Sequence, residues 1–173
     1  LENEGGVAAC NLKFDQLQHP DLHFVYPVAS TDDVKKNPTS DNFLTTWYDF
    51  IKNHPYGSIN DWYETLGIPK KQGIISVQEA STMMKKLSLK SFEGGYKVMI
   101  VWMAEKMNTE SANRLLKFLE EPSDKTVFIL IAEDETALLP TILSRCQVLH
   151  FNALSEQEVV QALIDQENCD EAD

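Results

Sequence analysis

Residues 96–132 read YKVMIVWMAEKMNTESANRLLKFLEEPSDKTVFILIA, and the expected fold class follows from them. The segment Tyr96–Met103, apolar apart from Lys97, is typical of a strand that is covered on both faces. A helix follows, with Asn108 as its N-cap and Pro122 at its end, and Thr126–Ala132 then reads as a second buried strand. Strand, helix and strand in this order predict a parallel sheet, because parallel strands need a crossover connection.

The alternation continues toward the C-terminus. A short helix through Leu138–Leu143 leads to Gln147–Phe151, which is expected to form a further strand. Ser155-x-x-Glu158 is the pattern of a capping box and opens a last helix, and an acidic tail follows from Asp165. We therefore expect an α/β fold, with a parallel sheet that carries helices on both faces.

Residues 1–95 add one more strand and a helical segment. Leu22–Tyr26 reads as a strand between Pro20 and Pro27, after a helical stretch around Cys10–Leu17. Residues 29–72 are interpreted as a helical insertion, since about 40 residues rarely support a core of their own. Their aromatic side chains follow a helical spacing, which fits packing against the sheet or a partner-binding face. The residues that carry this pattern are the aromatic Phe43, Trp47, Phe50, Trp62 and Tyr63 together with the aliphatic Ile51 and Leu66.

A further helix is expected from Ser76, which forms a capping box with Glu79, to about Leu89. Its predicted apolar face consists of Val77, Ala80, Met84 and Leu87.

Composition excludes several classes of protein. The chain has 173 residues, 43% of them hydrophobic, which is enough for a core, and its longest apolar run, Val98–Ala104, is too short for a membrane span. We expect a soluble, cytoplasmic protein with no membrane contact. The net charge is −12, and residues 120–173 hold 13 acidic side chains against Lys125 and Arg145, so contact with nucleic acid is expected only through other subunits.

No cofactor or metal site is expected. The sequence contains no Gly-x-x-x-x-Gly-Lys-Ser/Thr loop, and Trp102-Met103 end the strand where an ATPase of this architecture needs carboxylates for Mg²⁺. Pro20 separates His19 from His23, so the two imidazoles are not expected to share a helix face around a metal. The three cysteines include no Cys-x-x-Cys pair, which argues against disulfides and zinc. Glu105 beside Lys106 is read as a surface pair.

Arg145 is one of only two arginines, and its sequence context leaves two interpretations open. It is either a surface arginine paired with a nearby acid such as Glu133, or an arginine finger that reaches the γ-phosphate bound by a neighbouring subunit. A planar, permanently charged fork suits charge that is spread over phosphate oxygens. The pattern alone does not choose between them.

Residues 106–122, KMNTESANRLLKFLEEP, resemble the AAA+ clamp-loader subunits of bacterial DNA polymerase III, which read Ala-x-Asn-x-Leu-Leu-Lys-x-Leu-Glu-Glu-Pro here. The similarity extends to Ser144-Arg145-Cys146 within residues 140–146, the Ser-Arg-Cys element of that family, and to His19-Pro20-Asp21. It covers roughly residues 10–28 and 73–165.

The resemblance implies a partial AAA+ P-loop-type domain. Residues 1–28 would be the N-terminal part of its core, 29–72 the helical insertion, 73–152 the remainder of the core and 153–173 the start of the lid domain. The phosphate-loop part is then expected before Leu1, and the rest of the lid and the collar after Asp173. Family members often hold zinc upstream of His-Pro-Asp, but this sequence has only Cys10 there, so zinc is not carried over.

Two departures from the ATPases of the family make the chain most similar to its delta-prime branch. Trp102-Met103 replace the Asp-Glu pair, and Ala132-Glu133 stand where a sensor threonine is usual. The resemblance then implies a subunit that is not an enzyme by itself and presents Arg145, flanked by Ser144 and Cys146, to the ATP site of an adjacent gamma/tau subunit.

The implied partners are the gamma/tau and delta subunits and, through the assembled complex, the sliding clamp and primed DNA. Two alternatives stay open: an ATP-hydrolysing gamma/tau-type subunit whose phosphate loop is missing from this sequence, and a protein-interaction module that has left the ring.

Overall fold

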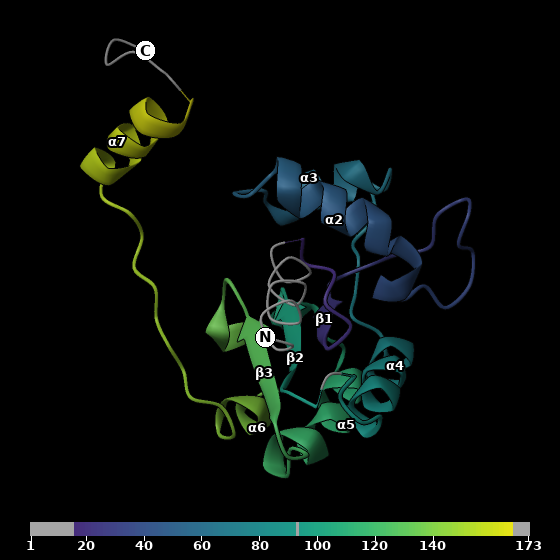
Figure 1. Cartoon of the computed structure of the whole chain (residues 1–173). Coiled ribbons are helices and arrows are strands. Elements are labelled where there is room, and N and C mark those ends of the chain that lie inside the picture. The colour runs from purple at the N-terminus through teal and green to yellow at the C-terminus, as the bar shows by residue number, and fades with distance from the viewer. Residues whose placement is uncertain (1–15, 93, 168–173) are drawn as a thin grey trace, which may run out of the picture.

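The computed structural model of the chain describes residues 16–92 and 94–167 (Figure 1). The helix expected around Cys10–Leu17 and the acidic tail after Glu167 lie largely or wholly outside these residues. No helix of the described part has the length and apolar character needed to cross a membrane. The elements are β1 (Leu22–Val25), η1 (Ser40–Phe43), α2 (Leu44–Asn53), α3 (Ile59–Thr65), α4 (Val77–Ser88), β2 (Lys97–Trp102), η2 (Ala104–Lys106), α5 (Thr109–Glu120), β3 (Thr126–Ile131), η3 (Glu135–Ala137), α6 (Pro140–Leu143) and α7 (Glu156–Glu167).

The three strands form one parallel sheet in the order β1-β2-β3. Val101 in the centre lies opposite Val25 on one side and Leu130 on the other. The crossover between β2 and β3 is α5, and the longer connection between β1 and β2 carries α2, α3 and α4. The predicted α/β class with a parallel sheet is confirmed.

Helices α4 and α5 cover one face of the sheet (Figure 1). Met83 and Leu87 from α4 and Leu115 from α5 pack against Met99 and Val101 of β2, and all five side chains are buried. On α4 the buried methionine is Met83 rather than the expected Met84, because the helix turns its Glu79–Met83–Leu87 row toward the interior.

Helices α2 and α3 cover β1 and β2 on the opposite face through an aromatic cluster. The rings of Tyr26 and Trp47 stack with centroids 4.1 Å apart, and Trp62 meets both edge-on at 5.0 and 5.2 Å. The Trp62 Nε1–H also donates to the Pro27 carbonyl at 2.8 Å, which satisfies its polar group in the interior. The aromatic pattern of residues 29–72 therefore belongs to the core.

Strand β3 is only half covered, so the expectation of a fully buried strand is wrong for one of its faces. Phe128 and Leu130 pack on the side of α4 and α5, whereas Val127, Ile129 and Ile131 are 39%, 42% and 44% exposed. This face of β3 is exposed because the aromatic cluster of α2 and α3 covers only β1 and β2. The cluster includes residues of those two strands, and β3 lies at the edge of the sheet beyond it.

The strand expected at Gln147–Phe151 is not formed. These residues are exposed and extended, and they lead away from the sheet toward α7 (Figure 1). A strand needs a neighbour that satisfies its N–H and C=O groups, and within the described residues this segment pairs with none of the three strands. High β-propensity at Val148, Leu149 and Phe151 is therefore insufficient here.

Candidate functional site

The Ser144-Arg145-Cys146 segment forms a tight turn directly after α6. Pro140 occupies the first turn of this helix, where the N–H that proline lacks would have no partner within the helix. Ile142, on the same helix, is buried and anchors it to the core. The Arg145 N–H donates to the Ile142 carbonyl at 3.0 Å, and the Cys146 N–H donates to the Leu143 carbonyl at 3.2 Å. The backbone thus fixes where the Arg145 side chain leaves the surface.

The Arg145 guanidinium is held within the chain by three groups, the Glu120 carboxylate, the Thr141 carbonyl and the Ser144 hydroxyl. Its Nε–H donates to Oε1 of Glu120 at 2.8 Å, and its Nη2 donates to the same oxygen. Its Nη1 donates to the Thr141 carbonyl at 2.7 Å and to Oγ of Ser144 at 3.3 Å. Glu120 is the last residue of α5, so this pair joins α5 to the turn after α6.

The acid that pairs with Arg145 is Glu120, and not Glu133, which was the example expected from the sequence. Glu133 lies elsewhere, where its N–H donates to Oε1 of Glu105 at 3.4 Å. The side chains of Arg145 and Glu120 are 30% and 48% exposed, so the guanidinium lies at the surface, where another molecule can reach it.

The flanking residues Ser144 and Cys146 stabilise the turn, and neither is placed as a reactive nucleophile. The Ser144 hydroxyl donates to the Thr141 carbonyl at 3.2 Å. Burial raises the pKa of the Cys146 thiol, which keeps it protonated at neutral pH and therefore weakly reactive.

The end of β2 offers no oxygen ligand at Trp102 or Met103. The Trp102 ring packs in the aromatic cluster, 5.2 Å from the Trp47 ring and 6.2 Å from the Phe50 ring. Met103 is buried and adopts φ 56° and ψ 53°, a left-handed conformation that costs energy for a residue other than glycine. Both side chains are structural at the position where a magnesium site would need carboxylates.

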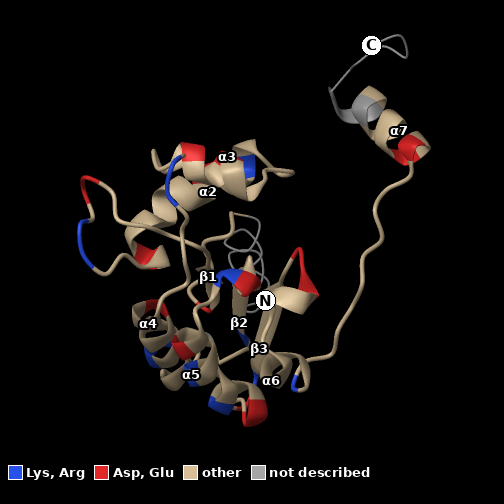
Figure 2. Ribbon diagram, turned by 180° about the vertical axis from the view of Figure 1, so that it is seen from behind, with Lys and Arg blue, Asp and Glu red and all other residues tan. Residues whose placement is uncertain are grey.

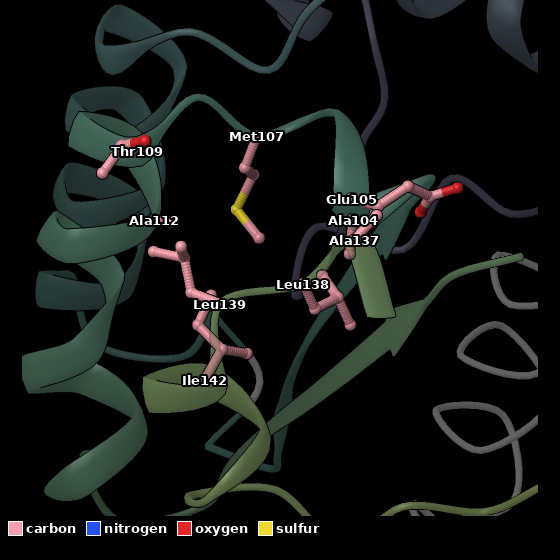
Figure 3. Close-up of a pocket in the computed structure, with 9 residues that line it drawn as sticks. All are labelled: Ala104, Glu105, Met107, Thr109, Ala112, Ala137, Leu138, Leu139 and Ile142. Atoms are coloured by element: carbon pink, nitrogen blue, oxygen red, sulfur yellow. The ribbon is translucent and has the colours of Figure 1, made fainter. Parts of the chain in front are cut away.

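Glu105, just past the strand end, does not form the expected surface pair with Lys106 among the described contacts. One carboxylate oxygen accepts the Glu133 N–H, and the other, Oε2, is buried without a hydrogen-bond partner. Glu105 also borders a small cavity of about 110 Å³, in which its carboxylate points away from the other lining side chains (Figure 3). That volume is well below the 300 Å³ or so at which ligand pockets begin, and Glu105 is the one ionisable residue among the nine that line it.

The His19-Pro20-Asp21 segment is structural in this fold. The Asp21 N–H donates to Nδ1 of buried His19 at 3.1 Å, and the Asp21 carboxylate accepts the Phe92 N–H at 2.8 Å. Among residues 16–92 and 94–167, no three His, Cys, Asp or Glu side chains are grouped so that they could hold a metal ion.

Glu79 is a buried acid whose environment the sequence did not reveal. Ser76 caps α4 by accepting the Glu79 N–H at 3.3 Å, but the Glu79 side chain does not complete the expected capping box. It reaches instead to the N-terminus of η1, where its Oε2 accepts the Ser40 N–H at 2.6 Å, while Oε1 has no partner. Burial raises the pKa of Glu79 from 4.5 to about 7, against the lowering effect of the Ser40 bond.

Replacing Glu79 by glutamine is expected to change how stability depends on pH. Because its folded-state pKa is raised, the folded chain binds more protons than the unfolded chain between pH 4.5 and about 7, so the carboxylate lowers stability as pH rises through this window. The free energy of unfolding should fall by at most about 3 kcal/mol across this window, and Glu79→Gln should abolish this fall. Urea denaturation of the full-length protein at pH 5 and pH 8 measures the effect. Exposed Glu64→Gln on α3 is the control, and equal pH slopes for wild type and Glu79→Gln would refute the expectation.

Comparison with known proteins assigns the sequence to a family. The family model described as "DNA polymerase III, delta subunit" matches residues 2–155. The chain is 38% identical over 95 residues to DNA polymerase III subunit delta' of Bacillus subtilis, a match that covers 54% of this chain and 29% of the relative. It is 57% identical over 53 residues to subunit delta' of Pseudomonas aeruginosa, covering 31% and 16%.

The similarity also extends to another subunit type. Subunit tau/gamma of Haemophilus influenzae is 35% identical over 87 residues, covering 50% of this chain and 13% of the relative. A solved DNA polymerase III gamma subunit-related protein from Thermotoga maritima aligns with a TM-score of 0.47 and 30% identity, over 51% of this chain and 30% of that one. The matches span less than a third of the length of these relatives.

Proposed function

The chain belongs to the DNA polymerase III delta-prime subunit family, and from this premise we propose that the full-length protein is a non-hydrolysing subunit of a bacterial clamp loader. In this role it helps a ring of related subunits place the sliding clamp on primed DNA. It offers Arg145 to the ATP that a neighbouring gamma/tau subunit binds. Ser144 and Cys146 shape the turn that presents the guanidinium.

The position of Arg145 carries the arginine-finger assignment. The side chain leaves a turn that backbone hydrogen bonds fix, and it lies partly exposed at the surface. A guanidinium in that place can form two parallel hydrogen bonds to phosphate oxygens and stabilise the charge that develops during phosphoryl transfer.

The residues at the end of β2 support the non-hydrolysing role. Mg²⁺ in a nucleotide site is held by oxygen ligands, whereas Trp102 is part of the aromatic cluster and Met103 is buried. The similarity to tau/gamma subunits favours the alternative, an active ATPase that belongs to the same ring.

ATP hydrolysis by the isolated full-length protein separates the two candidates. At saturating Mg·ATP we expect no hydrolysis above background, since no carboxylate is available at positions 102 and 103. A gamma/tau subunit assayed in parallel is the positive control. Turnover similar to that of the control would reject the non-hydrolysing role in favour of the gamma/tau type.

Contact with DNA is proposed to run through the other subunits. Lys and Arg are interspersed with Asp and Glu over the described ribbon, and the described part of α7 carries acidic residues and no basic ones (Figure 2). A net charge of −12 disfavours binding to a phosphate backbone by this chain alone. The proposed partners are therefore the gamma/tau and delta subunits, with the clamp and primed DNA reached by the assembled complex.

A further inference from the structure

The contacts of Arg145 leave its guanidinium little capacity for another ligand. An arginine has five N–H groups, and the four hydrogen bonds to Glu120, Thr141 and Ser144 use four of them. Two of these hydrogen bonds come from Nε and Nη2, which form one edge of the planar guanidinium, and both are donated to Oε1 of Glu120. This edge is one of those through which arginine binds phosphate in the bidentate manner.

We propose that Glu120 competes with the neighbouring subunit's γ-phosphate for Arg145 and so restrains the finger until the subunit interface closes. The inference rests on the proposed function, since it concerns the same arginine. Delivery of the finger is then an exchange of one anion for another: the guanidinium leaves the Glu120 carboxylate and pairs with phosphate oxygens. No covalent bond is made or broken in this step.

The location of the pair suits a reversible restraint. Both side chains are partly exposed, and exposed ion pairs are worth about 0–1 kcal/mol, or up to roughly fivefold in an equilibrium. A γ-phosphate, which carries up to two negative charges, can displace one singly charged carboxylate from such a pair, whereas a buried pair would not exchange readily. The turn itself stays in place, because the Arg145 N–H is bonded to the Ile142 carbonyl and the side chain alone has to move.

Glu120→Gln tests this competition, because it keeps the shape of the side chain and removes its charge. In a clamp loader reconstituted with the full-length variant, we expect ATP hydrolysis without DNA to rise about two- to fivefold at the one site that faces this subunit. Total hydrolysis should rise by less, and its relative stimulation by primed DNA should be smaller. Glu121→Gln is the matched control: it removes a charge one residue further on, is exposed, and should behave as wild type.

Arg145→Ala and the double variant Glu120→Gln/Arg145→Ala complete the design. The rise must depend on the finger, so the double variant should hydrolyse ATP at the rate of Arg145→Ala alone. If Arg145→Ala is impaired but Glu120→Gln shows unchanged or lower hydrolysis without DNA, the restraint is refuted and the proposed function stands. If all variants match wild type, the assignment of Arg145 as an arginine finger is refuted, and so is its restraint by Glu120.

Discussion

Arg145→Ala is expected to lower ATP hydrolysis by about 10³–10⁵-fold at the one site that faces this subunit in the assembled loader. Removal of the guanidinium leaves the developing charge on the γ-phosphate without its partner. Folding and assembly should be almost unaffected, because the side chain is partly exposed and its ion pair with Glu120 contributes little stability.

The measured defect depends on how the ring uses its sites. Total hydrolysis should fall only in part, since the other sites keep their own fingers, while clamp loading falls further if every site must act. Arg145→Lys should restore little activity, because an ammonium group cannot reproduce the bidentate fork. DNA-stimulated ATP hydrolysis and clamp loading by the reconstituted loader are the measurements.

Arg114→Ala is the matched control for this experiment. Arg114 is also a partly exposed arginine, 45% accessible, and it is paired within the chain to Glu110 at 3.1 Å. It lies on α5, and its Nη1 donates to Oγ of Ser81 on α4. Its removal should leave both rates near wild type. Wild-type rates for Arg145→Ala as well would return Arg145 to the surface interpretation.

The sequence predicted those parts of the fold that depend on local signals. Asn108 caps α5 by accepting the Ser111 N–H at 2.8 Å, and Ser155 and Glu158 form the expected reciprocal capping bonds. The parallel sheet followed from the order of strands and helices, a rule that does not depend on distant contacts.

The predictions were wrong where the local structure depends on residues that are distant in the sequence. Gln147–Phe151 has the composition of a strand but no pairing partner within the described residues, and β3 extends beyond the helices that cover its neighbours. The left-handed backbone of Met103 and the burial of Glu79 against Ser40 also depend on tertiary packing, which periodicity does not reveal.

Arg145 was singled out from the sequence, but its partner within the chain was not. Arg145 stood out because arginine is rare in this chain and because of the Ser-Arg-Cys element. Glu120 was already part of the Leu-Glu-Glu-Pro motif, 25 residues earlier, but sequence spacing does not show that the end of α5 meets the turn after α6. The proposed restraint depends on this contact between two elements that are distant in the sequence.

Omission of the full-length protein from a reconstituted clamp loader is expected to have the other large effect. The ATP site next to it would lack both the finger and one wall of the subunit interface, so an incomplete ring should not open and close the clamp productively. The match to the delta-prime family supports this expectation, since residues 2–155 fit that family's model.

Loading of the sliding clamp on primed DNA, with and without the full-length protein, is the most direct test of the proposed function. Gamma/tau, delta and the clamp from the same organism are held constant, and the protein is added back in equal amount to the ring. We predict that loading is lost without it and restored by its addition. Loading at an unchanged rate in its absence, or failure of the protein to assemble with gamma/tau and delta, would contradict its assignment as a clamp-loader subunit.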